Sequence, residues 1–131
     1  VLKWSVPFKP GALKAEGLKD GKPVSEFVLK TAGAAAKITL VSDSGHLQAD
    51  GKDIAQIEYR VVDALGARVP DAEQEVSFAI EGPGKIIGIG NGDLSNVEPV
   101  QEPKHKAYQG RGLATVQAGR EAGKIKLTAK I

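Results

Sequence analysis

The glycine-rich stretch 82–93 (GPGKIIGIGNGD) contains the residue types that first suggest chemistry, because closely spaced glycines let backbone amides approach a phosphate. A dinucleotide site needs G-x-G-x-x-G, yet the third glycine, counted from Gly88, would fall on Asp93. A P-loop needs Ser or Thr after Gly-Lys, but the Gly-Lys pairs of this chain are followed by Pro23, Asp53, Ile86 and Ile125. The stretch therefore predicts short strands and tight turns without a nucleotide.

Metal-ligating residue types occur without the spacing that a metal site requires. His46 and His105 lie in predicted turns, with no His or Cys at ligand spacing, so we interpret both as surface histidines. No D-x-D-x-D-G loop is present, and turn aspartates that bond their own backbone are favoured over calcium ligands. The loop aspartates in question are Asp43, Asp50, Asp53, Asp63, Asp71 and Asp93. The prediction is no metal and no cofactor.

Charge and cysteine content exclude further classes of function. The 18 Lys and Arg residues nearly balance 16 Asp and Glu residues, and the lysines are spread along the chain, so neither nucleic acid nor a membrane surface is predicted as a partner. The absence of cysteine excludes disulfides, thiolate catalysis and zinc ribbons. No long apolar run or charged leader is found, and the lack of any methionine suggests a fragment of a longer polypeptide.

Period-2 alternation of apolar residues recurs after residue 34, whereas helical periodicity is almost nowhere sustained. Turn signals rich in Gly, Pro and Asp separate the alternating segments. The pattern predicts an all-β fold, an immunoglobulin-like antiparallel β-sandwich over 34–131. The alternating sets are Ile38/Leu40, Ile57/Tyr59/Val61, Val76/Phe78/Ile80, Leu113/Thr115 or Ala114/Val116, and Ile125/Leu127/Ala129/Ile131.

Two connections in this region have contrasting signals. The loop 119–123 has hairpin length, so segments 113–118 and 124–131 are predicted to be adjacent strands of one sheet. The stretch 93–109 has no clear period and contains two prolines, which predicts an irregular loop or a crossover between sheets.

Residues 1–33 form a separate pattern. Strands are expected at 2–6, 13–16 and 23–30, as a short N-terminal β-meander in which Trp4 contributes to the core. Three short strands with few large apolar residues are marginal alone, so this part is expected to pack on the sandwich or on another neighbour.

Several motifs follow one another along the chain: 4–15 (WSVPFKPGALKA), 31–33 (TAG), 49–53 (ADGKD), 88–93 (GIGNGD) and 107–110 (AYQG). This succession resembles the C-terminal region of bacterial β-galactosidases of glycoside hydrolase family 2. The resemblance covers essentially the whole chain. One departure is the Ala34-Ala35-Ala36 run, where the family commonly has a proline after the glycine.

The resemblance implies that residues 1–33 are the tail of a preceding β-sandwich plus a linker, and that residues 34–131 are the next module. Both follow the catalytic barrel in such enzymes. It also implies a periplasmic or extracellular location for the parent protein.

Catalytic carboxylates are not expected in this chain. Retaining glycoside hydrolysis needs two carboxyl groups about 5–5.5 Å apart, and the family supplies them from barrel strands. Here the glutamates, for example Glu58, Glu75 and Glu81, lie in turns or in outward strand phases. The fragment is predicted to be catalytically silent.

Four residues around the irregular loop are candidate contacts for a sugar or a partner: Tyr108, Arg111, Asn91 and Asp93. A tyrosine ring could stack on a sugar, and backbone amides at 91–93 could hold a ligand. The structural alternatives are favoured, because Asn-Gly is a strong hairpin signal and an edge tyrosine commonly bonds backbone through its hydroxyl.

The leading hypothesis is therefore a non-catalytic accessory domain of a β-galactosidase-like hydrolase, whose partners are other domains of the parent enzyme or a sister subunit. A carbohydrate-binding module is the first alternative, with Tyr108, Phe8 or Trp4 as the aromatic platform. A cell-surface adhesion repeat is the second, although the two halves of the chain are not alike.

Overall fold

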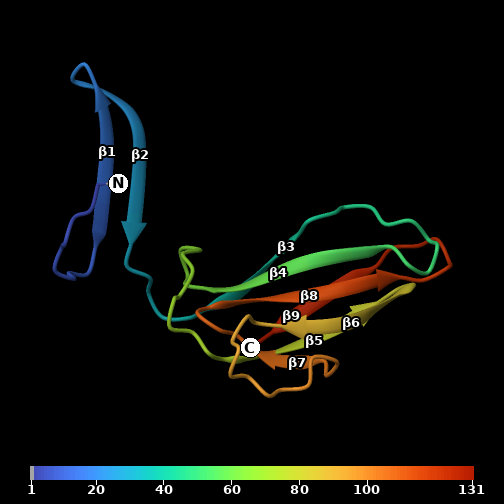
Figure 1. The fold of residues 1–131 in the computed structure, drawn as a ribbon. Helices are drawn as coiled ribbons and strands as arrows, with labels where there is room; N and C mark the ends of the chain where they lie inside the picture. Colours follow the sequence, from blue (N-terminus) through green and yellow to red (C-terminus); the bar gives the residue numbers. More distant parts are fainter. Residues whose placement is uncertain (1) are drawn as a thin grey trace. The chain divides into compact units, whose positions relative to one another are not determined.

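The computed structural model describes residues 2–131, which divide into two compact units with the boundary between Ala32 and Gly33 (Figure 1). Every regular element in the described part is a β-strand. No helix there is long and apolar enough to cross a bilayer. The all-β prediction is confirmed.

The first unit is a hairpin of β1 (Ala12–Lys19) and β2 (Lys22–Lys30). Asp20 and Gly21 form its two-residue turn with φ values of 52° and 74°, the left-handed geometry of a type I′ turn, which Asp-Gly favours. The predicted strand at 2–6 is not formed, because β1 pairs only with β2 and alternation alone supplies no partner strand. The placement of Trp4 in a core is also wrong, since the indole is 73% exposed.

The second unit is an antiparallel sandwich of two sheets. One sheet has the order β3-β4-β8-β6 and the other β7-β5-β9. The seven strands are β3 (Lys37–Ser42), β4 (Ile54–Val62), β5 (Glu75–Glu81), β6 (Gly84–Gly90), β7 (Lys104–Lys106), β8 (Arg111–Ala118) and β9 (Lys126–Lys130).

The alternating stripes of both sheets form the core between them. Tyr59, Val61 and Val76 are completely buried. In β8 the side chains of Ala114 and Val116 face the core, and the alternative set that begins with Leu113 faces outward. The rings of Tyr59 in β4 and Phe78 in β5 meet edge to face with centroids 5.1 Å apart, so they join the two sheets.

Gly112 is required by this aromatic contact. It lies opposite Tyr59 in the β4–β8 register, and a Cβ at Gly112 would come within 2.1 Å of the tyrosine hydroxyl oxygen. The glycine therefore leaves the space that the phenol ring occupies.

The connection after β8 corrects one prediction. β8 is flanked by β4 and β6, so both of its edges are filled, and β9 pairs instead with β5 in the opposite sheet. The loop 119–123 thus passes from one sheet to the other and closes no hairpin. The irregular stretch after β6 also crosses between sheets, as predicted, with the short strand β7 inside it.

Candidate functional site

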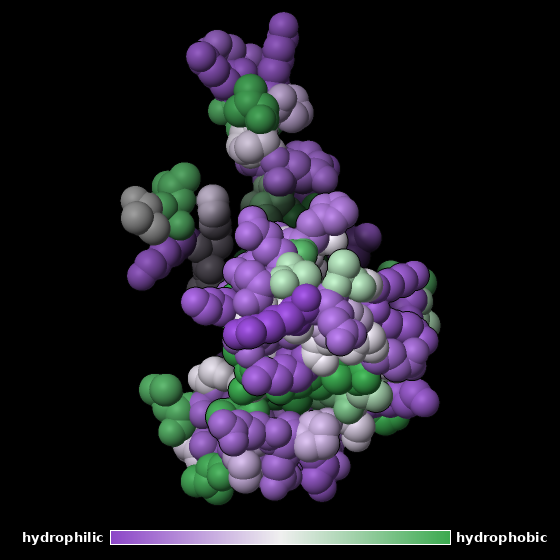
Figure 2. All heavy atoms as spheres, turned by 90° about the vertical axis from the view of Figure 1, so that its right-hand side faces the viewer, coloured by the Kyte–Doolittle hydropathy of each residue, from purple (hydrophilic) through white to green (hydrophobic). Residues whose placement is uncertain are grey.

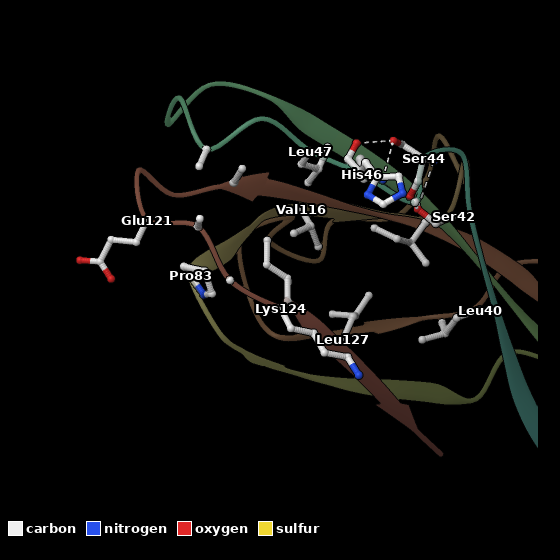
Figure 3. A pocket seen from close by; sticks show the side chains of 18 residues that line it. Leu40, Ser42, Ser44, His46, Leu47, Pro83, Val116, Glu121, Lys124 and Leu127 are labelled. Atoms are coloured by element: carbon white, nitrogen blue, oxygen red, sulfur yellow. Dashed lines mark hydrogen bonds between the residues drawn. The ribbon is translucent and has the colours of Figure 1, made fainter.

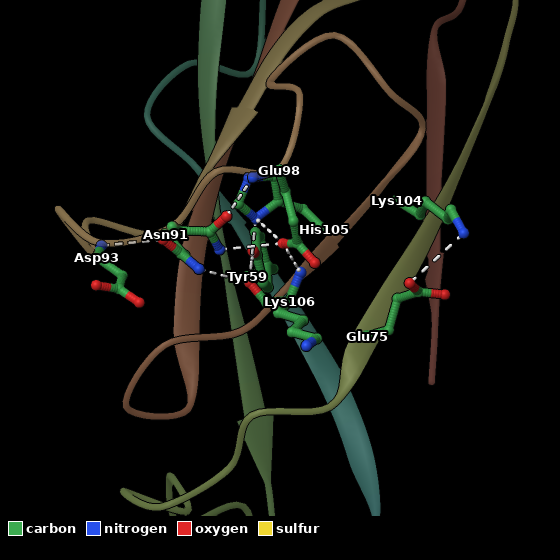
Figure 4. A network of polar contacts seen from close by, with 9 residues as sticks. Tyr59, Glu75, Asn91, Asp93, Glu98, Lys104, His105 and Lys106 are labelled. Atoms are coloured by element: carbon green, nitrogen blue, oxygen red, sulfur yellow. Dashed lines mark hydrogen bonds and ion pairs between the residues drawn. The ribbon is translucent and has the colours of Figure 1, made fainter.

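The crossover between β6 and β7 gathers most of the polar contacts near the sequence-predicted site residues (Figure 4). Asn91, Asp93 and Tyr108 line one hollow of about 290 Å³. Arg111 lies outside it, in a neighbouring shallow trough of about 550 Å³ to which Asn91 also contributes. The structure therefore brings three of the four candidates together and places the fourth next to them.

Asn91 and Asp93 bind the loop itself. Asn91 donates from Nδ2 to the Lys106 carbonyl at 3.0 Å and accepts at Oδ1 from the Asp93 amide at 2.9 Å. Asp93 Oδ1 accepts from the amide and the hydroxyl of Ser95 at 2.9 and 2.7 Å. The Asn-Gly pair thus ends β6 and starts the crossover, where a hairpin was predicted.

Glu98 is the centre of this network, and sequence reasoning did not single it out. Its Oε2 accepts from the Lys106 amide at 2.9 Å and from Asn96 Nδ2 at 3.1 Å. The Asn96 side-chain oxygen in turn accepts from the Glu98 amide at 2.6 Å. The carboxylate therefore ties the start of the crossover to β7.

His105 is buried, with 3% of its surface exposed, so its interpretation as a surface histidine is wrong. It is the central residue of β7, whose flanking lysines face outward, and this alternation turns the imidazole into the sandwich. His105 Nδ1 lies 3.2 Å from both Glu98 Oε2 and the Lys106 carbonyl. Both neighbours are acceptors, so the contact is favourable when Nδ1 carries the proton.

Tyr59 supports the same backbone from the core side. Its hydroxyl donates to the Lys106 carbonyl at 3.2 Å. Burial raises the pKa of this phenol well above its usual value, so it stays a neutral donor. The predicted tyrosine-to-backbone bond is thus made by Tyr59, whereas Tyr108 exchanges backbone hydrogen bonds with Arg111.

The carboxyl groups of this region are stabilised in their charged form. The Lys106 amide, followed by the Asn96 side chain, lowers the pKa of Glu98. The Ser95 hydroxyl and amide lower the pKa of Asp93. A general acid needs the opposite shift, toward the pH at which it donates its proton. The arrangement suits backbone bracing better than acid catalysis.

Other loop aspartates also bind backbone, as predicted for turn residues. Asp63 is 4% exposed and accepts from the amides of Gly33, Leu65 and Ala67 at 2.8, 2.9 and 2.8 Å. These bonds, with that from Gly33 the strongest influence, lower the pKa of Asp63. Among residues 2–131, no cluster of three His, Cys, Asp or Glu residues is arranged to hold a metal ion.

A second hollow of about 710 Å³ opens at the end of the sandwich near the 42–53 loop. Hydrophobic side chains appear there as a band framed by hydrophilic ones (Figure 2). Its floor includes the core residues Ala55, Ile57 and Val116. At its rim, the Ser44 hydroxyl donates to the His46 carbonyl of the same loop at 2.6 Å (Figure 3). The carboxylate of Glu121 points away from the hollow. The hollow is an open extension of the core.

Known proteins are similar to this chain in sequence and in fold. The model of the glycoside hydrolase family 2 C-terminal domain 5 matches residues 38–131. A β-galactosidase of Bacteroides ovatus is 40% identical over 128 residues, which is 98% of this chain and 15% of that relative. A β-glucuronidase of Formosa agariphila is 40% identical over 81 residues, 60% of this chain and 8% of its own length.

A solved structure shows the same arrangement of strands. The glycosyl hydrolase family 2 member from Bacteroides cellulosilyticus aligns with a TM-score of 0.91 and 37% identity, covering 97% of this chain and 18% of that protein. The chain thus spans less than a fifth of the length of these relatives. Sequence, fold and matched region agree, and the chain belongs to the glycoside hydrolase family 2 C-terminal domain 5 family.

Proposed function

We propose that this chain is a non-catalytic accessory region of a β-galactosidase-like hydrolase, and that it stabilises the parent enzyme by packing against its other domains. The observation that carries the proposal is the use made of the carboxylates in the crossover. The carboxylates of Glu98 and Asp93 accept hydrogen bonds from backbone amides and neighbouring side chains, and the pKa of each is lowered.

A retaining hydrolase would need a carboxylic acid with a raised pKa beside a second, ionised carboxylate. Five carboxyl groups in the described residues have lowered pKa values, because of hydrogen bonds or an adjacent arginine. These are Asp50, Glu58, Asp63, Asp93 and Glu98. A parent that acts on β-galactosides is supported by the identity to the Bacteroides ovatus enzyme.

Deleting residues 33–131 from the full-length polypeptide tests the accessory role. We expect a lower melting temperature or an altered oligomeric state. Unchanged expression, melting temperature, assembly and turnover would contradict the proposal.

Glu98→Gln in the full-length polypeptide tests the absence of catalysis. We expect a lower melting temperature, with kcat on an aryl β-galactoside unchanged within about twofold at temperatures where the protein is folded. Glu75→Gln is the matched control, because Glu75 makes only an exposed ion pair, 3.6 Å from Lys104. A loss of kcat by about 10³ or more in Glu98→Gln at an unchanged melting temperature would assign chemistry to this carboxyl.

A further inference from the structure

Three aliphatic side chains on the crossover between β6 and β7 have no cover. Leu94 is 105% exposed, Val97 94% and Val100 55%. Single exposed aliphatic residues are ordinary on protein surfaces, but several together on one loop mark a contact site. We call these three residues, with the trough that Val100 lines, the crossover face.

The loop that presents these side chains is fixed from within and from both sheets. The Asp93 carbonyl accepts from the Asn96 amide at 3.2 Å and Asp93 Oδ1 accepts from the Ser95 amide at 2.9 Å, so the turn that carries Leu94 is closed. The Val100 carbonyl accepts from Ile89 in β6 at 2.6 Å, and the Pro103 carbonyl accepts from Phe78 in β5 at 2.7 Å. Because the backbone is braced, the aliphatic side chains are held outward and lose little freedom on binding.

The trough next to Val100 adds a surface of matching character. Leu113 forms one wall, and the lining includes Gly88 and Gly90, where a Cβ would meet only the Val100 carbonyl at 3.9 Å or nothing within 4 Å, so the sheet surface is low there. An incoming side chain could therefore approach the backbone closely. Glu58, Asn91 and Arg111 also line the trough, but no aromatic ring on which a sugar could stack does. An aliphatic and glycine lining with polar residues beside it suits the apolar centre and polar rim of a protein interface.

We propose that the crossover face docks against another domain of the same polypeptide. The relatives supply the argument for this occupant, because the matched region is 15% of the Bacteroides ovatus enzyme and 18% of the Bacteroides cellulosilyticus structure. A covalently linked domain acts at high effective concentration, so a small apolar contact suffices to hold it. The inference rests on the proposed accessory function and specifies the face that performs it.

Cysteine labelling of the full-length polypeptide tests this docking. Residues 1–131 contain no cysteine, so a label introduced here is identified by its peptide mass. Val97→Cys probes the crossover face, and Leu65→Cys is the matched control, because Leu65 is 95% exposed but stands alone on its turn. We expect a maleimide to modify Val97→Cys at least about tenfold more slowly than Leu65→Cys, with equal rates after denaturation.

A second pair of variants guards against a cysteine that disturbs the contact. Leu94→Asp should lower the melting temperature of the full-length polypeptide, whereas Leu65→Asp should not. Equal labelling rates together with equal melting temperatures would overturn the docking. Protection that disappears on dilution to the monomer would instead assign the face to a second copy and overturn the same-chain proposal. If these tests overturn the docking but deletion of residues 33–131 still lowers the melting temperature of the parent, the accessory function stands and only the choice of face is wrong.

Discussion

Phe27 and Phe78 show how differently the two units of this chain use apolar residues. Phe78 in β5 is 6% exposed and meets the Tyr59 ring across the sandwich. Phe27 in β2 is 64% exposed, and no side chain of the hairpin strands is buried. The sandwich buries its stripes between two layers, whereas a two-stranded hairpin has one layer and nothing within its unit to cover it. Alternation therefore identifies strands but does not guarantee a core.

Replacing each of the two phenylalanines by alanine should give the largest difference in stability between the two units. In the chain 1–131, Phe78→Ala should cost about 3–5 kcal/mol of unfolding free energy, because it leaves a cavity between the sheets. Phe27→Ala should change it by less than about 0.5 kcal/mol, because the ring is mostly hydrated already. Urea unfolding followed by circular dichroism measures both. Similar costs for the two variants would mean that the hairpin has a core of its own.

A methyl group added at Gly112 tests how tightly the Tyr59 ring is packed in the sandwich core. Gly112→Ala should destabilise the chain by about 1–3 kcal/mol, because the new Cβ collides with the Tyr59 ring. Gly90→Ala is the control, since a Cβ there meets nothing within 4 Å. Thermal unfolding compares them. Equal midpoints would show that Tyr59 moves aside freely.

Replacing the buried carboxylate of Asp63, directly after β4, should have a smaller effect on stability. Asp63→Asn replaces one of the two oxygens that accept from Gly33, Leu65 and Ala67 with a donor, so an amide loses its partner. We expect a melting temperature several degrees lower, with Asp71→Asn, at an exposed position, as the control. Hydrogen exchange of Gly33 should accelerate in the Asp63 variant only. An unchanged exchange rate at Gly33 would show that Asp63 does not anchor the linker.

The smallest expected effect is the change of melting temperature at acid pH. The folded pKa values of Asp63 and Glu98 lie below their unfolded values of about 3.9 and 4.3, so their stabilisation is complete above those values and is lost as the pH falls toward the folded ones. The melting temperature should therefore decline below about pH 5. The gap between wild type and Glu98→Gln should close over the same range. A gap that is constant from pH 7 to pH 3 would contradict the ionic role of Glu98.

Local patterns were sufficient to predict most strands. They could not predict which strands pair, because β8 and β9 show equally good alternation, and the choice depends on which sheet edges are already filled. The absent strand at 2–6 and the exposed Trp4 have the same cause, since a stripe needs a facing layer.

The site was predictable only in outline. The irregular composition of 93–109 indicated a crossover, and Asn91, Asp93 and Tyr108 do share a hollow. The importance of Glu98 and the burial of His105 depend on contacts with Lys106 and on the facing sheet, which no local spacing encodes. The alternation in Lys104-His105-Lys106 was the one available signal for the inward histidine.

The pairing of β9 with β5 has a consequence for synthesis on the ribosome. β9 is the last of the described strands to emerge, and until it arrives the backbone of β5 on that side has no partner. A nascent chain stalled after β8 would expose a bare strand edge of alternating Val, Phe and Ile side chains, which is a template for association with other chains. Synthesis of β9 covers this edge of β5 and so removes the template.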